Sequence, residues 1–120
     1  MDKKESREDY LEAILVLSNE GKSVRSVDVA NHLSFSRASV SIAMKKLKAE
    51  HLIEIDSSGE IHLSKKGREV ASKTFEKHKY LTSWFESIGV SEAKAEKIAC
   101  EIEHSIDEDT FDKIKNRLNK

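Results

Sequence analysis

Three residues able to bind a metal ion stand close together late in the sequence. Cys100, Glu103 and His104 have the spacing i, i+3 and i+4, so on a helix their side chains project from one face. A thiol, a carboxylate and an imidazole that converge in this way form a donor set for a transition metal. A single cysteine is also often just a small buried apolar residue, so the spacing favours a metal site without establishing one.

Three further candidate ligands come earlier in the chain. Asp9 and Glu12 are again spaced i, i+3 on an expected helix, and His78 falls within another. Each has an ordinary alternative, since Asp9 can favour the helix dipole, Glu12 can be a surface acid and His78 can be an exposed side chain. Together the six candidates lie on three expected helices and predict a site for one or two metal ions.

Apolar periodicity and capping residues predict that the elements carrying these residues are mostly helices. In the first half, three helices are expected, each with a polar cap: 6–19 with Ser6, 27–33 with Ser26, and 37–50 with Ser36. The pattern then changes to alternation in 52–56 and 60–63 around a Ser-Ser-Gly turn, which predicts a β-hairpin. Three helices followed by a hairpin is the order of a winged helix-turn-helix.

Only helices are expected in the second half. They run from Ser64 to about Ile88, from a cap at Ser91 to about Ser105, and from Asp107 or Asp109 to Leu118. The predicted fold class is therefore mainly α with a small β-hairpin. We expect a winged helix-turn-helix domain over 1–66 and an all-helical domain over 67–120.

The third helix of a winged helix-turn-helix enters the major groove of DNA, with its N-terminal residues nearest to the base edges. Val40, Met44 and Leu47 have the spacing of a core-facing stripe, which leaves the other side of this helix outward. An arginine there can bind two acceptors of a guanine, and lysines can meet phosphates. The candidate DNA-binding residues are Arg37, Ser39, Ser41, Lys45, Lys46, Lys65 and Lys66. An ordinary solvated helix face is the alternative, and winged helices also bind proteins.

Composition and charge narrow the class of protein. The net charge is −1, but residues 22–73 carry ten basic and six acidic side chains, whereas residues 76–120 carry eight and ten. A basic part that binds phosphate and an acidic part that binds a cation would give this division. The sequence shows no signal peptide, so we expect a cytoplasmic protein. It has no apolar run of about 20 residues, so we expect no membrane partner. It has one cysteine, so we expect no intrachain disulfide. It has no activated nucleophile, glycine-rich phosphate loop or HExxH pattern, so no enzyme is expected.

Several stretches of the sequence resemble the diphtheria toxin repressor and manganese transport regulator family of metal-dependent repressors. They are Asp9-Tyr10-Leu11-Glu12, Ala38-Ser39-Val40, Leu63-Ser64-Lys65-Lys66-Gly67, His78, and Glu103-His104. The likeness covers nearly the whole chain. It implies the two-domain form of the manganese regulators, without the SH3-like third domain of the longer iron regulators.

The resemblance also implies a homodimer in which 67–120 is the metal-binding and dimerisation domain. Its metal site would join the first helix of the DNA-binding domain to the later helices and hold two recognition helices at the spacing of a palindromic operator. Carried over by position, the metal ligands are Asp9, Glu12, His78, Cys100, Glu103 and His104. The expected dimer interface uses Leu81, Trp84, Phe85 and Ile88, and the alternative is that these residues are ordinary core within one chain.

The candidate ligands differ from both branches of the family. The manganese branch has a carboxylate where this chain has Cys100, and the iron branch has a methionine where this chain has Asp9. A thiolate disfavours Mn²⁺ relative to Fe²⁺, Co²⁺ or Zn²⁺, whereas the carboxylates of Asp9 and Glu12 suit Mn²⁺ or Fe²⁺. Fe(II) is therefore the first expected metal and Mn(II) the second, with Co(II), Ni(II) or Zn(II) as substitutes.

The expected function is a metal-dependent transcriptional repressor that binds palindromic operator DNA when loaded with Fe(II) or Mn(II) and so controls metal-ion homeostasis. Two alternatives from other classes stay open. One is a metal-independent winged-helix regulator that senses oxidants through Cys100, and a chelator would leave its DNA binding unchanged. The other is a small metal-dependent hydrolase, which turnover assays on generic esters and phosphates would detect.

Overall fold

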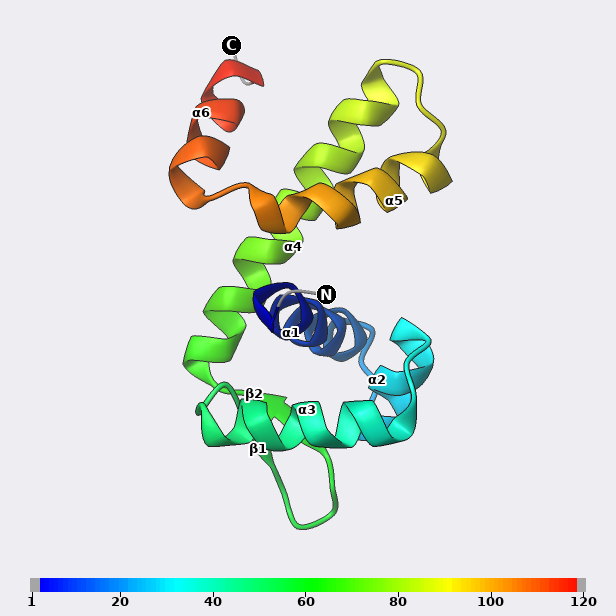
Figure 1. Ribbon diagram of the computed structural model, residues 1–120, viewed down its shortest axis with the longest axis vertical. Coiled ribbons are helices and arrows are strands. Elements are labelled where there is room, and N and C mark those ends of the chain that lie inside the picture. The colour runs from blue at the N-terminus through cyan, green and yellow to red at the C-terminus, as the bar shows by residue number, and fades with distance from the viewer. Residues whose placement is uncertain (1–2, 119–120) are drawn as a thin grey trace. The chain divides into compact units, whose positions relative to one another are not determined.

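The chain folds into helices and one short hairpin, in the order that the sequence predicts (Figure 1). The computed structural model describes the backbone of residues 3–118 and the side chains of residues 7–117. The chain divides into two compact units, Met1–Ser72 and Lys73–Lys120. The boundary between them falls within one continuous helix, α4 (Lys65–Ser87), instead of in a loop.

The first unit packs three helices and a hairpin around one apolar core. Its elements are α1 (Lys3–Asn19), α2 (Ser26–Leu33), α3 (Arg37–Ala49), β1 (Ile53–Ile55), β2 (Ile61–Leu63) and the first turns of α4. Fully buried side chains come from all of them, including Leu11, Val29, Met44, Ile61 and Ala71. Burial of one large aliphatic side chain stabilises a fold by roughly 1.5–3 kcal/mol. This shared core gives the first unit its winged helix-turn-helix arrangement.

The hairpin strands alternate as the sequence predicts. Ile53 and Ile61 are buried, whereas Glu54 and His62 face solvent as a cross-strand pair. The strands are antiparallel with the register Ile53↔Leu63, Glu54↔His62 and Ile55↔Ile61. Outside this pair, the N–H of Ile61 donates to the carbonyl of Val24 at 2.7 Å, which fastens the second strand to the segment before α2.

A dense set of hydrogen bonds holds the turn of the hairpin, residues 56–60, which we call the wing tip. The carboxylate of Asp56 accepts from the N–H groups of Ser58 at 2.9 Å and Glu60 at 3.0 Å. The side chains of Ser58 and then His62 also bond to this carboxylate and hold the pKa of Asp56 well below its usual range. From outside the hairpin, the guanidinium of Arg25 donates to the carbonyl of Ser58.

Four helix caps expected from the sequence are confirmed. Each side-chain oxygen accepts an N–H three residues on: Ser36 from Ser39, Ser64 from Gly67, Ser91 from Lys94, and Asp107 from Thr110. Helix starts leave N–H groups without partners inside the helix, and short polar side chains satisfy them locally. Ser64 has a second role, because its hydroxyl donates to the carbonyl of His51 at 2.7 Å and ties the start of α4 to the segment after α3.

Two other cap predictions are wrong. α1 begins at Lys3, so Ser6 lies within the helix instead of before it. The second helix begins at Ser26, and its N-cap is Arg25, whose backbone N–H donates to the carboxylate of Asp28 at 2.9 Å. A carboxylate at the third helical position can satisfy the cap residue from within the helix, so the cap itself need not be a short polar residue.

Within residues 73–118, the second unit consists of helices only. Its elements are the remainder of α4, α5 (Glu92–Ile102), a 3-10 turn η1 (Glu103–Ser105) and α6 (Glu108–Leu118). Lys77 connects the turn after η1 to α4 by donating to the carbonyl of Ile106 at 2.6 Å. Ion pairs join α4 to α6: Lys73 with Glu108, and Glu76 with Lys115.

The second unit departs from the sequence prediction at one place. The helix expected to continue to about Ser105 ends at Ile102, and residues 103–105 tighten into the 3-10 turn. No helix within residues 3–118 combines the length and apolar character needed to cross a bilayer.

Candidate metal centre and nucleic-acid interface

The carboxylate of Glu103 is the centre of a buried polar cluster in the second unit. One oxygen, Oε2, lies 2.9 Å from Nδ1 of His78 on α4, and the other, Oε1, lies 3.5 Å from Nε2 of His104. Glu103 is 1% exposed, and the imidazole of His104 is 3% exposed. Within the second unit the structure therefore brings four of the six expected ligands around the carboxylate of Glu103, because Sγ of Cys100 on α5 also lies within 4.8 Å of a Glu103 oxygen.

The chemistry of this cluster fits a bound cation. Oε1 of Glu103 is buried and makes no hydrogen bond to any residue that the structure describes. A buried carboxylate without full hydrogen bonding is costly, and a cation is one way to satisfy it. A carboxylate oxygen with two imidazole nitrogens is also a common ligand set for divalent transition metals. Glu103, His78 and His104 are thus suitable as the protein ligands of such an ion.

Cys100 lies in the last two turns of α5 and is exposed. Because the α-helix ends at Ile102, the i, i+3, i+4 face expected for Cys100, Glu103 and His104 does not continue as one regular helix. The 3-10 turn directs Glu103 inward, where its carboxylate meets His78 while one of its oxygens stays within 4.8 Å of Sγ of Cys100. This departure could not be read from spacing, because it depends on a contact between residues 25 positions apart.

Asp9 and Glu12 lie on α1 in the first unit, and both are half-buried. They are one turn apart, so they share a face of the helix as expected. Between them, Tyr10 is buried and packs edge-on against Phe35 with ring centroids 5.7 Å apart. Burial, and after it the negative charge of Asp9, raise the pKa of the Tyr10 hydroxyl.

A second group of potential ligands occurs at the wing, where the sequence analysis proposed none. Single ligand atoms of Asp56, Glu60 and His62 all lie within 4.8 Å of one another. Asp56 and His62 are exposed, and the hydrogen bonds of Asp56 to the wing tip already account for its position. We therefore assign this group a role in holding the turn and propose no metal site there.

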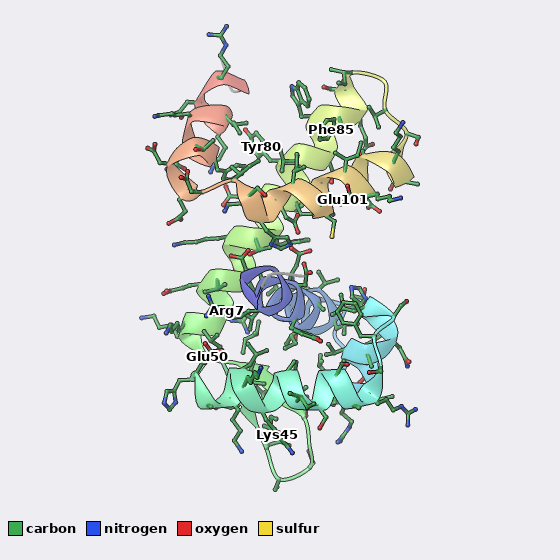
Figure 2. The ribbon with its side chains drawn as sticks, in the orientation of Figure 1. Arg7, Lys45, Glu50, Tyr80, Phe85 and Glu101 are labelled. Atoms are coloured by element: carbon green, nitrogen blue, oxygen red, sulfur yellow. The ribbon has the colours of Figure 1, made fainter. Side chains whose placement is uncertain are left out.

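The seven expected DNA-binding residues all lie in the first unit, and all are exposed: Arg37, Ser39, Ser41, Lys45, Lys46, Lys65 and Lys66. The first five are on α3, and Figure 2 shows Lys45 on the side of that helix that faces away from α1. Arg7 on α1 and Glu50 at the end of α3, also marked in Figure 2, form an ion pair of 3.2 Å. Val40, Met44 and Leu47 are buried on the opposite face, as expected.

The second unit also has an apolar groove of about 580 Å³ between α4 and the segments that follow α5. Tyr80 and Phe85 of α4, both labelled in Figure 2, line it together with Trp84, Ile106 and Ile114. Trp84 is 39% exposed, and Ile88, four residues further along the chain, is 60% exposed. A contiguous apolar surface of this kind is typical of an interaction site.

Two protein-family models match the chain. The N-terminal DNA-binding domain of iron-dependent repressors matches residues 3–59, and their metal-binding and dimerisation domain matches residues 64–120. The transcriptional regulator MntR of Escherichia coli is 31% identical over 110 residues, which cover 92% of this chain and 71% of that protein. MntR of Geobacillus kaustophilus is 30% identical over 109 residues, which cover 91% of this chain and 77% of that protein.

Two solved structures are similar to this chain in fold. The manganese regulator SloR superposes with a TM-score of 0.84 at 27% identity, over 94% of this chain and 53% of SloR. Zn²⁺-bound ScaR has a TM-score of 0.78 at 23% identity, over 94% of this chain and 53% of ScaR, and shows the fold alone. The chain spans about half the length of these two structures.

Proposed function

The chain belongs to the iron-dependent repressor family of metal-dependent transcriptional regulators, and we propose that it binds operator DNA as a homodimer when it is loaded with Fe(II) or Mn(II). In this role it controls metal-ion homeostasis from the cytoplasm, without catalysing a reaction. We assign DNA binding to residues 1–66, and metal binding and dimerisation to residues 67–120. The operator is palindromic, since a twofold dimer presents two equivalent recognition helices.

The observation that carries the metal proposal is Glu103, a buried carboxylate between His78 and His104 with one oxygen that makes no hydrogen bond within the described residues. A divalent ion supplies positive charge and open coordination positions there. The proposed ligands are Asp9, Glu12, His78, Cys100, Glu103 and His104. The thiolate of Cys100 favours Fe(II) over Mn(II), whereas the carboxylates accept either, so Fe(II) is the proposed physiological metal. Co(II), Ni(II) or Zn(II) would substitute.

The proposed switch follows from the ligands' places in the sequence. Asp9 and Glu12 belong to the first unit, and the other four ligands belong to the second. Ligation by both sets restricts motion of the DNA-binding residues and lowers the entropy cost of ordering them on DNA. Linkage then requires that operator DNA tighten metal binding by the same factor.

The proposed DNA contacts are Arg37, Ser39, Ser41, Lys45 and Lys46 of α3, with Lys65 and Lys66 at the start of α4. Their exposure supports this assignment. The proposed dimer interface is the apolar surface of Leu81, Trp84, Phe85 and Ile88. A homodimer would cover the two exposed members, Trp84 and Ile88, which otherwise remain in contact with water.

A metal-independent regulator that senses oxidants is the second candidate, because Cys100 is exposed and thus within reach of an oxidant. Its DNA binding would be insensitive to a chelator and sensitive to peroxide. The proposed repressor has the opposite responses, since removal of the metal removes the switch.

The deciding experiment is an anaerobic titration with Fe²⁺ and with Mn²⁺, with DNA affinity measured by fluorescence anisotropy on duplexes from upstream of the protein's own gene neighbourhood. We expect Fe²⁺ to tighten DNA binding at lower concentration than Mn²⁺. His104→Ala should weaken metal binding by at least about tenfold, a loss found even for the outer partners of metal ligands. His32→Ala, which removes an exposed imidazole from α2, is the matched control. A His104→Ala protein that keeps its helical circular dichroism and responds fully to metal would refute the ligand assignment.

A further inference from the structure

Ile42 is an exposed aliphatic side chain on α3. It is 58% exposed, whereas the other large hydrophobic side chains described in the first unit are buried or half-buried. The other two exposed large hydrophobic residues, Trp84 and Ile88, belong to the second unit, where Trp84 lines the apolar groove. No side chain among residues 7–72 covers Ile42, so the described part of the first unit does not explain its exposure.

The position of Ile42 on the helix is set by the core. Val40 and Met44 are 0% and 1% exposed and anchor α3 in the first unit. A step of two residues rotates about 200° around a helix axis, and Ile42 is two residues from each of them. Its side chain therefore points almost directly away from the core. Ala38, one turn earlier, is exposed on the same side.

The surroundings of Ile42 are basic, with Lys45 and Lys46 exposed on the following turn of the helix. These charges complement the phosphates that border a DNA groove. A β-branched residue is also a weaker helix former than lysine, glutamine or glutamate, so intrinsic helix propensity does not account for isoleucine at an open position. An apolar side chain held outward beside cations thus matches a duplex groove with an apolar feature on its floor.

In the major groove, thymine alone among the four bases presents an apolar group, its C5-methyl. We propose that Ile42 is a specificity-determining residue that packs against thymine methyl groups in each half-site of the operator. The side chain has no donor or acceptor, so it selects thymine by contact and gives no hydrogen bond to other base edges. This inference rests on the proposed DNA binding and adds the class of base that α3 selects there.

The test uses DNA chosen by the protein itself. Duplexes are enriched from a randomised library with the full-length metal-loaded protein, and each thymine of the enriched sequence is then replaced in turn by deoxyuridine, which lacks only the methyl. For the unaltered protein we expect one or two positions in each half-site where the replacement weakens binding by about fourfold. That factor corresponds to about 0.8 kcal/mol for one methyl-sized group.

Two variants of the same residue make the assignment specific. Ile42→Ala should bind the enriched duplex more weakly and should lose its sensitivity to deoxyuridine at those positions. Ile42→Val keeps a branched apolar side chain and should retain most of that sensitivity. Both variants should bind metal in the absence of DNA as the unaltered protein does, because Ile42 is exposed and is not one of the proposed metal ligands.

The possible outcomes separate this inference from the proposed function. Enrichment of a duplex whose deoxyuridine sensitivity survives in Ile42→Ala would overturn the role of Ile42 and leave DNA binding intact. An enriched sequence without thymine in its half-sites would do the same. Failure of the metal-loaded protein to enrich any duplex would overturn both.

Discussion

At the scale of single residues, Gly67 is the least tolerant of a side chain among the four glycines of the chain. A Cβ built on it would lie 1.9 Å from the carbonyl oxygen of Leu52, which is a backbone atom that cannot rotate away. The close approach occurs where Ser64 joins the start of α4 to the segment after α3, so Gly67 lets the helix begin against the hairpin.

Gly67→Ala should therefore destabilise the protein, although alanine is the better helix former. Forcing extra volume into a packed position typically costs about 1–3 kcal/mol, and here the backbone must move. Urea denaturation measures the change in the free energy of unfolding. Ser72→Ala, at an exposed position of the same helix, should stay within about 0.5 kcal/mol of the original. Equal stability of the two variants would contradict the steric argument.

The residue scale also shows how far the sequence could define the site. Residue type and spacing were enough to nominate Glu103 and His104, and the structure places the carboxylate of Glu103 between His104 and His78. Spacing could not reveal that Glu103 occupies a 3-10 turn, because the turn accompanies a contact with a distant helix. The exposure of Ile42 is likewise a property of the folded unit, although its two-residue offset from Val40 and Met44 is visible in the sequence.

At the scale of elements, the wing depends on a contact made from outside the hairpin. Its strands are only three residues long, and an isolated two-stranded hairpin is marginally stable in water. The guanidinium of Arg25 supports the wing tip through the carbonyl of Ser58, a partner 33 residues away. This long sequence separation explains why the strands could be predicted but their support could not.

Arg25→Ala should loosen the wing tip without unfolding the first unit. A hydrogen bond from a charged donor contributes about 1.5–3 kcal/mol, so amide hydrogen exchange over residues 57–60 should accelerate by about tenfold or more. Exchange at the buried residues of α3 should change little. Lys22→Ala, which removes an exposed cation nearby in the sequence, serves as control. Unchanged exchange at the wing tip in Arg25→Ala would show that the hairpin is held by its own bonds alone.

Helix boundaries followed local chemistry where a cap was a short polar side chain. Ser36, Ser64, Ser91 and Asp107 could be identified because each accepts an N–H within its own turn. The start of α2 could not, since Asp28 satisfies the cap from inside the helix and Arg25 is also engaged by the hairpin. The start of a helix could thus be predicted where its cap bonds to a residue a few positions away in the sequence.

At the scale of the whole molecule, self-association is the property that the proposed function requires. Ile88 is 60% exposed at the end of α4, so a polar replacement should leave the folded chain unaffected while weakening the proposed homodimer. Burying one isoleucine contributes roughly 1.5–3 kcal/mol, and a twofold interface loses two. Ile88→Asp should therefore raise the dimer dissociation constant by at least about tenfold, measured by sedimentation equilibrium. Ser72→Asp is the control on the same helix, and an unshifted dimer constant for Ile88→Asp would place the interface elsewhere.

The brevity of the hairpin has a consequence for behaviour in concentrated solution. Open strand edges are templates on which chains add to one another and form aggregates. Here each strand offers only three residues, the solvent face carries Glu54 and His62, and Val24 already occupies the N–H of Ile61 on the outer side of the second strand. A charged edge this short gives a neighbouring chain little backbone to extend. The wing can therefore project from the first unit without becoming a seed for fibrils.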